Sequence, residues 1–158
     1  MTTVLERTAA RSLIPDDLFF RLVERIVREH AEIDREMAER IVDQTLAFLS
    51  ACARNRGEPL APSPMVDHGW HEFLMYTREY AEFCQRVAGR FLHHVPEDTA
   101  AMVSEADPIE VRRRTVEAIE QTGFLVDREL WFAEDTSVCS QCHNGCYNDP
   151  PPDPPPKK

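Results

Sequence analysis

Apolar residues recur at helical spacing along most of the first 130 positions, and this pattern predicts an all-α fold. In residues 15–29 they fall three and four positions apart, which predicts an amphipathic helix with Pro15 in its first turn. Asp34 has the side chain of a good N-cap for a second helix. Gly57 and Pro59 then end that helix.

The second half of the pattern predicts two more helices. Residues 57–64 contain three prolines and predict a stiff connection. The next apolar arc spans 64–88 and predicts a single long helix. Asp107 followed by Pro108 is a typical helix start, and the helix that follows is expected to reach about Gln121.

The predicted architecture is a compact bundle of four main helices with an irregular tail that is rich in cysteine and then in proline. Residues 1–14 are expected to be a flexible N-terminal arm, and 15–133 form the helical domain. The apolar stretch 124–133 is expected to pack back on the bundle. Residues 134–158 form the tail, whose prolines favour polyproline II or disorder.

Charge narrows the function classes. The 158-residue chain has 28 acidic and 18 basic residues and a net charge of -10. This argues against nucleic-acid binding and against docking on anionic membranes, because both need a basic surface. No apolar run reaches the ~18 residues of a membrane span, and the N-terminus lacks the apolar core of a secretory signal. We therefore expect a cytoplasmic protein whose thiols stay reduced.

The tail carries the densest cluster of reactive side chains: Cys139, Cys142, His143 and Cys146. A C-x2-C spacing is half of a common zinc site, and Gly145 would allow the turn that brings the third thiolate to the same ion. Adjacent side chains point apart in most backbone conformations. The fourth ligand could therefore be His143 or a residue of the helical domain. This cluster predicts zinc binding.

Other interpretations of the cysteines compete with zinc. The sequence C-x-x-C-H also matches c-type haem attachment, but that modification needs export. A redox dithiol is disfavoured because the motif does not lie between a strand and a helix. The tail could instead be presented to a partner enzyme that modifies its cysteines, or it could be an inert solvated segment. Cys52 and Cys84 are expected in the core.

A second candidate cluster starts the helix predicted over 64–88. Asp67 and His71 are four residues apart and hence share a face of the helix. A carboxylate and an imidazole at this spacing can share a metal, or Asp67 can orient the imidazole ring as a supporting partner. A buried pair that only satisfies its own hydrogen bonds is the structural alternative. His68 and Glu72 are expected to be solvated.

Two further histidines follow this helix. His93 and His94 lie in the short stretch 90–96, which is predicted to be extended. Neighbouring side chains of an extended segment point in opposite directions. We expect His94 to face the domain interior and His93 to face solvent.

These positions resemble the glycine-rich domain-containing protein-like family. The residues that carry the resemblance are Asp67, Trp70, His71, Tyr80, Gly89 and His94. It covers roughly residues 15–130, and the D-x-x-W-H run is its sharpest motif. The resemblance implies an α-helical domain in which the Trp-His region is a defining feature, and it implies no enzymatic activity. With only five glycines, the chain lacks the glycine-rich segment of longer members.

The leading functional hypothesis is a small cytoplasmic zinc-binding protein. Its three cysteines would hold the ion, with His143 or a domain histidine, His71 or His94, completing the site. A closed thiolate sphere would leave no position for water. The alternative is a carrier or interaction module whose tail is recognised by a protein partner. A third hypothesis is an enzyme with a metal at Asp67, His71 and His94. No serine hydrolase triad or phosphate-binding loop is recognisable.

Overall fold

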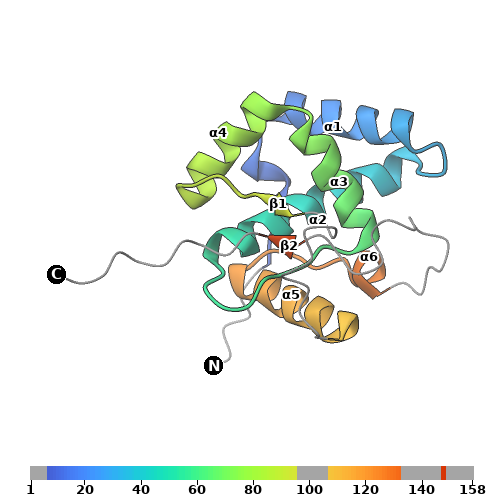
Figure 1. Ribbon diagram of the computed structural model, residues 1–158. Helices are drawn as coiled ribbons and strands as arrows, with labels where there is room; N and C mark the ends of the chain where they lie inside the picture. The colour runs from blue at the N-terminus through green and yellow to red at the C-terminus, as the bar shows by residue number, and fades with distance from the viewer. Residues whose placement is uncertain (1–6, 96–106, 133–146, 149–158) are drawn as a thin grey trace.

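The protein is predominantly helical, as the apolar periodicity predicts (Figure 1). The computed structural model describes residues 7–95, 107–132 and 147–148. The elements in chain order are η1 (Ala10–Leu13, a 3₁₀-helix), α1 (Asp16–Glu29), α2 (Arg35–Arg54), α3 (Pro64–Leu74), α4 (Thr77–Ala88), β1 (His94–Val95), α5 (Pro108–Thr122), α6 (Arg128–Phe132) and β2 (Tyr147–Asn148). Among the described residues, no helix is long and apolar enough to cross a membrane.

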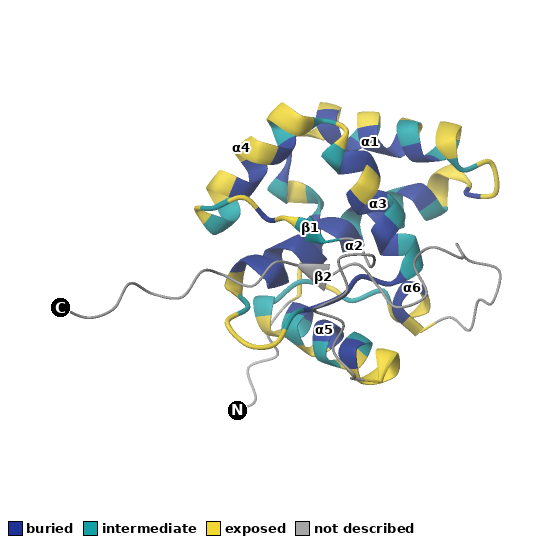
Figure 2. Ribbon diagram, in the orientation of Figure 1, coloured by how far each residue is buried: buried dark blue, intermediate teal, exposed yellow. Residues whose placement is uncertain are grey.

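Helix α2 forms the centre of the domain. It contacts η1, α1, α3, α4 and α5, and most of its ribbon in Figure 2 has the colour of buried residues. Near its middle, the ring of Phe48 lies 5.3 Å from that of Trp70 in α3 and 6.2 Å from that of Trp131 in α6, measured between centroids. All three side chains are completely buried. These rings belong to one hydrophobic core whose buried residues run from Ala10 to Trp131.

Local sequence signals fix most helix ends. The carboxylates of Asp34 and Asp107 accept hydrogen bonds from backbone N–H groups in the first turns of α2 and α5, which confirms both predicted N-caps. The Ser63 side chain does the same for α3. Gly89 and Gly123 close α4 and α5 with φ of 66° and 87°, a left-handed conformation that glycine adopts without steric cost.

The prediction of one continuous helix over 64–88 was wrong. The chain leaves α3 after Leu74 and enters α4 at Thr77, and Tyr76 between them is non-helical. In an unbroken helix, Trp70 and Tyr80 would lie ten residues and about 15 Å apart along the axis. The break instead folds α4 back, so that the Trp70 indole N–H reaches the Tyr80 hydroxyl at 2.9 Å. The apolar pattern continues through the break because both helices bury a face in one core.

Residues 7–14 pack on the domain, although the sequence suggests a flexible arm as far as residue 14. Ala10 is completely buried. The backbone of Thr8 bonds on both sides, donating to Gly123 O at 3.2 Å and accepting from Leu125 N at 3.0 Å. These contacts join the start of the described chain to the segment after α5. Partners so distant in sequence leave no local signal.

Candidate metal centre

Three side chains converge where α3 passes beside β1. The Nε2 atoms of His71 and His94 lie 2.8 Å apart. Asp67 Oδ1 is 3.0 Å from His94 Nε2, and Asp67 Oδ2 is 3.2 Å from His71 Nε2. Each carboxylate oxygen thus faces one imidazole. The structure brings together three residues that the sequence identified as candidate ligands.

The geometry of α3 explains two of these positions. Asp67 lies in the first turn, where the helix dipole stabilises a negative charge, and His71 lies one turn later on the same face. His94 reaches the site from outside the helix, in a two-residue strand. It turns inward as predicted: its side chain is 12% exposed, whereas His93 is exposed to solvent.

The cluster is buried on one side and open on the other. The side chain of Asp67 is 3% exposed and that of His71 is 47% exposed. Desolvation lowers the pKa of His71, and the nearby Asp67 carboxylate partly opposes this effect. A lowered pKa favours the neutral imidazole, whose lone pair can bind a metal. One buried carboxylate therefore lies beside a half-exposed imidazole, His71, and a mostly buried one, His94.

Glu72 is buried, so the prediction that it is solvated was wrong. Its carboxylate pairs with Arg25 of α1, and its Oε1 lies 3.7 Å from His30 Nε2 just after that helix. The ring of His30 also contacts His68, with centroids 4.2 Å apart. The periodicity of α3 alone could not reveal that α1 covers this flank. His30 has no sequence signal that links it to the site.

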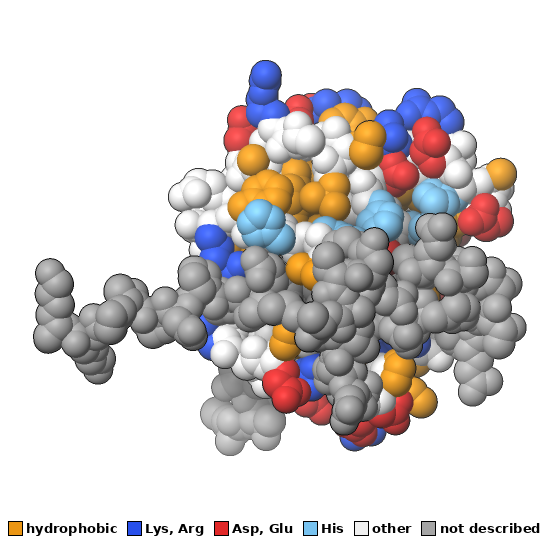
Figure 3. Space-filling model, in the orientation of Figure 1, with side chains coloured by type: hydrophobic (Ala, Val, Ile, Leu, Met, Phe, Trp, Pro, Cys, Tyr) orange, Lys and Arg blue, Asp and Glu red, His pale blue; other side chains and the backbone are white. Residues whose placement is uncertain are grey.

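Histidine side chains are spread across one face of the molecule, beside exposed apolar side chains (Figure 3). The apolar neighbours include Phe91, whose ring lies 4.8 Å from that of His93. The aromatic contact continues inward from Phe91 to Tyr80 at 5.3 Å. This face therefore combines imidazoles with an aromatic surface.

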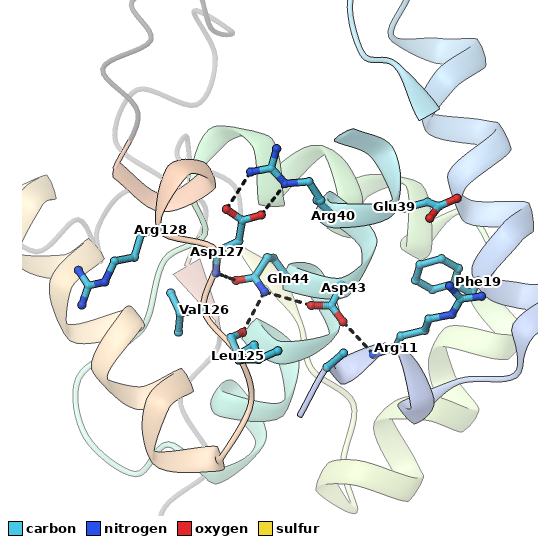
Figure 4. A pocket seen from close by; sticks show the side chains of 11 residues that line it. Arg11, Phe19, Glu39, Arg40, Asp43, Gln44, Leu125, Val126, Asp127 and Arg128 are labelled. Atoms are coloured by element: carbon cyan, nitrogen blue, oxygen red, sulfur yellow. Dashed lines mark hydrogen bonds and ion pairs between the residues drawn. The ribbon is translucent and has the colours of Figure 1, made fainter. Parts of the chain in front are cut away.

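A separate cavity of about 690 Å³ lies between η1, α1, α2 and the segment before α6 (Figure 4). The polar groups that line it bond to one another. Asp43 accepts from the backbone N–H of Arg11 at 2.9 Å and from the Gln44 amide at 3.1 Å. Arg40 makes two hydrogen bonds to Asp127. None of the described residues that line this cavity is a histidine or cysteine, so it offers no soft metal ligand.

Gln44 attaches the segment after α5 to the central helix. Its amide nitrogen donates to Leu125 O at 3.0 Å, and its amide oxygen accepts from Asp127 N and from Trp131 Nε1. The side chain is 2% exposed. These bonds, together with burial of Trp131, explain why the described part of the apolar stretch, residues 124–132, packs back on the bundle.

The tail residues Cys139, Cys142, His143 and Cys146 lie outside the described residues. The structure does describe β2, which pairs antiparallel with β1 so that His94 faces Asn148 and Val95 faces Tyr147. Cys52 and Cys84 are completely buried, as predicted. Burial raises the pKa of both thiols, which keeps them protonated and unreactive.

Together these features define an all-α domain with a cluster of two histidines and one carboxylate at its surface. Residues 12–122 match the UCP032817-like family, and the chain belongs to that family. The matched region contains all three residues of the cluster. Neither the curated proteins nor the solved structures include a significant match. The resemblance to the glycine-rich domain-containing protein-like family stays a prediction.

Proposed function

We propose that this is a metal-binding protein whose helical domain holds a divalent transition metal, zinc foremost, through Asp67, His71 and His94. The observation that carries the proposal is the convergence of two imidazole Nε2 atoms, 2.8 Å apart, on a carboxylate whose two oxygens lie 3.0 and 3.2 Å from them. An ion bound to both Nε2 atoms and to one of the carboxylate oxygens, at the distance of about 2.1 Å that is typical of zinc ligands, would use all three side chains.

A hydrogen-bonded cluster without metal fits the contacts less well. A neutral imidazole carries one N–H, on either Nδ1 or Nε2. If one Nε2–H donates to the second Nε2, the second nitrogen must accept and therefore carries no proton. It then has no hydrogen to donate to the carboxylate oxygen that faces it. A cation at the centre interacts favourably with all three donor atoms at once. The arrangement therefore suits a cation better than a shared proton.

The donor set favours zinc or a neighbouring first-row metal. Two imidazoles and one carboxylate suit Zn²⁺, and the same set binds Fe²⁺ in other proteins. Calcium and magnesium prefer oxygen ligands. With three protein ligands and His71 half exposed, such a site would keep at least one position for water or another ligand. This differs from the closed thiolate site expected from the tail.

Zinc binding by Cys139, Cys142, His143 and Cys146 remains a second proposal. The pairing of β2 with β1 supports a version in which the two clusters cooperate, because Tyr147, which follows Cys146 in sequence, is the partner of Val95. A tail recognised or modified by a protein partner is the competing proposal.

Metal titration of chelator-stripped protein tests the domain site. We expect one Zn²⁺ per chain by calorimetry, and loss of that binding in Asp67→Asn and His94→Gln. His93→Gln is the matched control, because it changes an exposed histidine next to His94 and should bind as wild type does. Retention of the ion after deletion of residues 135–158 would assign it to the domain. Wild-type affinity in both site variants would refute the domain site.

The tail is tested separately. A Cys139/Cys142/Cys146→Ser variant that still binds the first ion but loses a second would support an independent thiolate site. The intact mass of the protein expressed in its source organism is compared with the mass calculated from the sequence. A higher mass in wild type, but not in this variant, would favour modification by a partner enzyme. An unchanged mass together with no second ion would count against both roles of the tail.

A further inference from the structure

We propose that Tyr80 is a positioning residue for the metal site and holds His94 in place for coordination. The inference rests on the proposed function of Asp67, His71 and His94. Tyr80 lies in α4, on a different helix from Asp67 and His71, and its side chain is completely buried. Its hydroxyl nevertheless makes two hydrogen bonds that lead to His94 by different routes.

The first route runs through the backbone. The Tyr80 hydroxyl donates to the carbonyl oxygen of Leu92 at 2.6 Å. Leu92 is completely buried and lies two residues before His94. The chain reaches it from Gly89, where a φ of 66° reverses direction after α4. The hydroxyl thus fixes the short segment that delivers His94 to the site.

The second route runs through an aromatic ring. The Tyr80 hydroxyl accepts a hydrogen bond from Trp70 Nε1 at 2.9 Å. The Trp70 ring packs edge-on against the His94 ring, with centroids 4.4 Å apart at an angle of 61°. The indole bond fixes how the Trp70 ring is turned, and the ring then limits how far the imidazole can rotate.

His94 needs this support more than the other two ligands do. Asp67 and His71 are fixed relative to each other by one turn of α3. His94 comes from a two-residue strand, which by itself restrains a side chain weakly. Burial raises the pKa of Tyr80, so its hydroxyl keeps the proton that it donates to Leu92. The Tyr80 hydroxyl therefore holds His94, the third ligand, in position through both Leu92 and Trp70.

Tyr80→Phe tests the proposal, because it keeps the ring and removes only the hydroxyl. Loss of a group that orients a ligand typically weakens metal binding by 10- to 100-fold. We expect a decrease of about this size in Zn²⁺ affinity, measured by competition with a chromophoric chelator. The Co²⁺-substituted protein should also show an altered d–d absorption spectrum.

Thr115→Val is the matched control for general loosening. Thr115 is also completely buried, and its hydroxyl joins α5 to the connection before α3 by accepting from Ala61 N at 3.1 Å. It should lower stability while leaving zinc affinity and the Co²⁺ spectrum unchanged. Equal affinity in wild type and Tyr80→Phe would overturn the positioning role but not the metal site. Absence of binding in wild type would overturn both.

A wild-type measurement keeps the proposal falsifiable if Tyr80→Phe does not fold. The two tryptophan indoles give separate N–H resonances, and both donate to buried partners, Trp70 to Tyr80 and Trp131 to Gln44. Zinc should shift the Trp70 signal through the network that holds His94 and leave the Trp131 signal in place. If the Trp70 resonance does not respond to zinc bound at saturation, the proposed connection is refuted.

Discussion

The indole of Trp70 lies against the imidazole of His94, with ring centroids 4.4 Å apart. Trp70 and His71 are neighbours in sequence but have different surroundings. Trp70 is completely buried and contacts Phe48 of the central helix, whereas His71 points outward with its side chain 47% exposed. The same turn of α3 thus links the core to the surface cluster, and we expect stability and metal binding to be connected.

Zinc should stabilise the folded protein. A ligand that binds only the folded state at 100 times its Kd adds about 2.7 kcal/mol to the free energy of unfolding. Urea unfolding with and without saturating zinc measures this gain, and EDTA should reverse it. His94→Gln should gain nothing from zinc. The same gain in that variant would place the stabilising ion elsewhere.

Gly69→Ala should destabilise the junction of α2 and α3. A Cβ atom at this position would lie 2.1 Å from Thr45 Oγ1 and 2.9 Å from Ile41 Cγ2. Overpacking of this kind costs about 1–3 kcal/mol. Thermal and urea unfolding should show this loss. Gly57→Ala, where the nearest atom is 3.7 Å away, is the control and should be close to neutral.

Gln44→Ala should loosen the segment after α5. It removes the acceptor of the buried Trp131 indole N–H and of the Asp127 backbone N–H. An unsatisfied buried donor costs about 1–3 kcal/mol, so the free energy of unfolding should fall by at least about 2 kcal/mol. Tryptophan fluorescence should shift to longer wavelength. Gln121→Ala on the exposed face of α5 is the control, and a similar loss there would argue against this role of Gln44.

Asp43→Asn should change the pH dependence of stability. Burial raises the pKa of Asp43 above its ordinary value of 3.8. Between pH 3.8 and the raised pKa, the folded protein therefore binds more protons than the unfolded chain. The contribution of this carboxyl to the free energy of unfolding is complete below pH 3.8 and is lost as pH rises through the pKa of the folded state. The difference in the free energy of unfolding between wild type and variant should be largest near about pH 3 and smaller near about pH 7. An advantage that grows with pH would contradict the raised pKa.

Local signals accounted for much of the fold. The α1 and α2 segments have clear apolar faces, and the caps at Asp34 and Asp107 lie where the sequence predicts them. The i, i+4 spacing of Asp67 and His71 likewise placed two candidate ligands on one face. These features could be predicted because their causes lie within one or two helical turns.

Other features depend on contacts that no local pattern records. The break at Tyr76 is part of how α4 folds back on α3, and Glu72 is buried because Arg25 arrives from α1. His30 likewise reaches Glu72 from the end of a distant helix. In each case the partner is fixed by packing between different helices, and for Glu72 these helices are far apart in sequence.

By itself, the sequence determined the helical class, the two N-caps and the pairing of Asp67 with His71, because periodicity and capping act over a few residues. Only the tertiary structure decided that His94 would join them. His94 lies 23 positions after His71 in the sequence. Their approach to 2.8 Å depends on the fold of α4 over α3 and on the Tyr80 hydroxyl between Trp70 and Leu92.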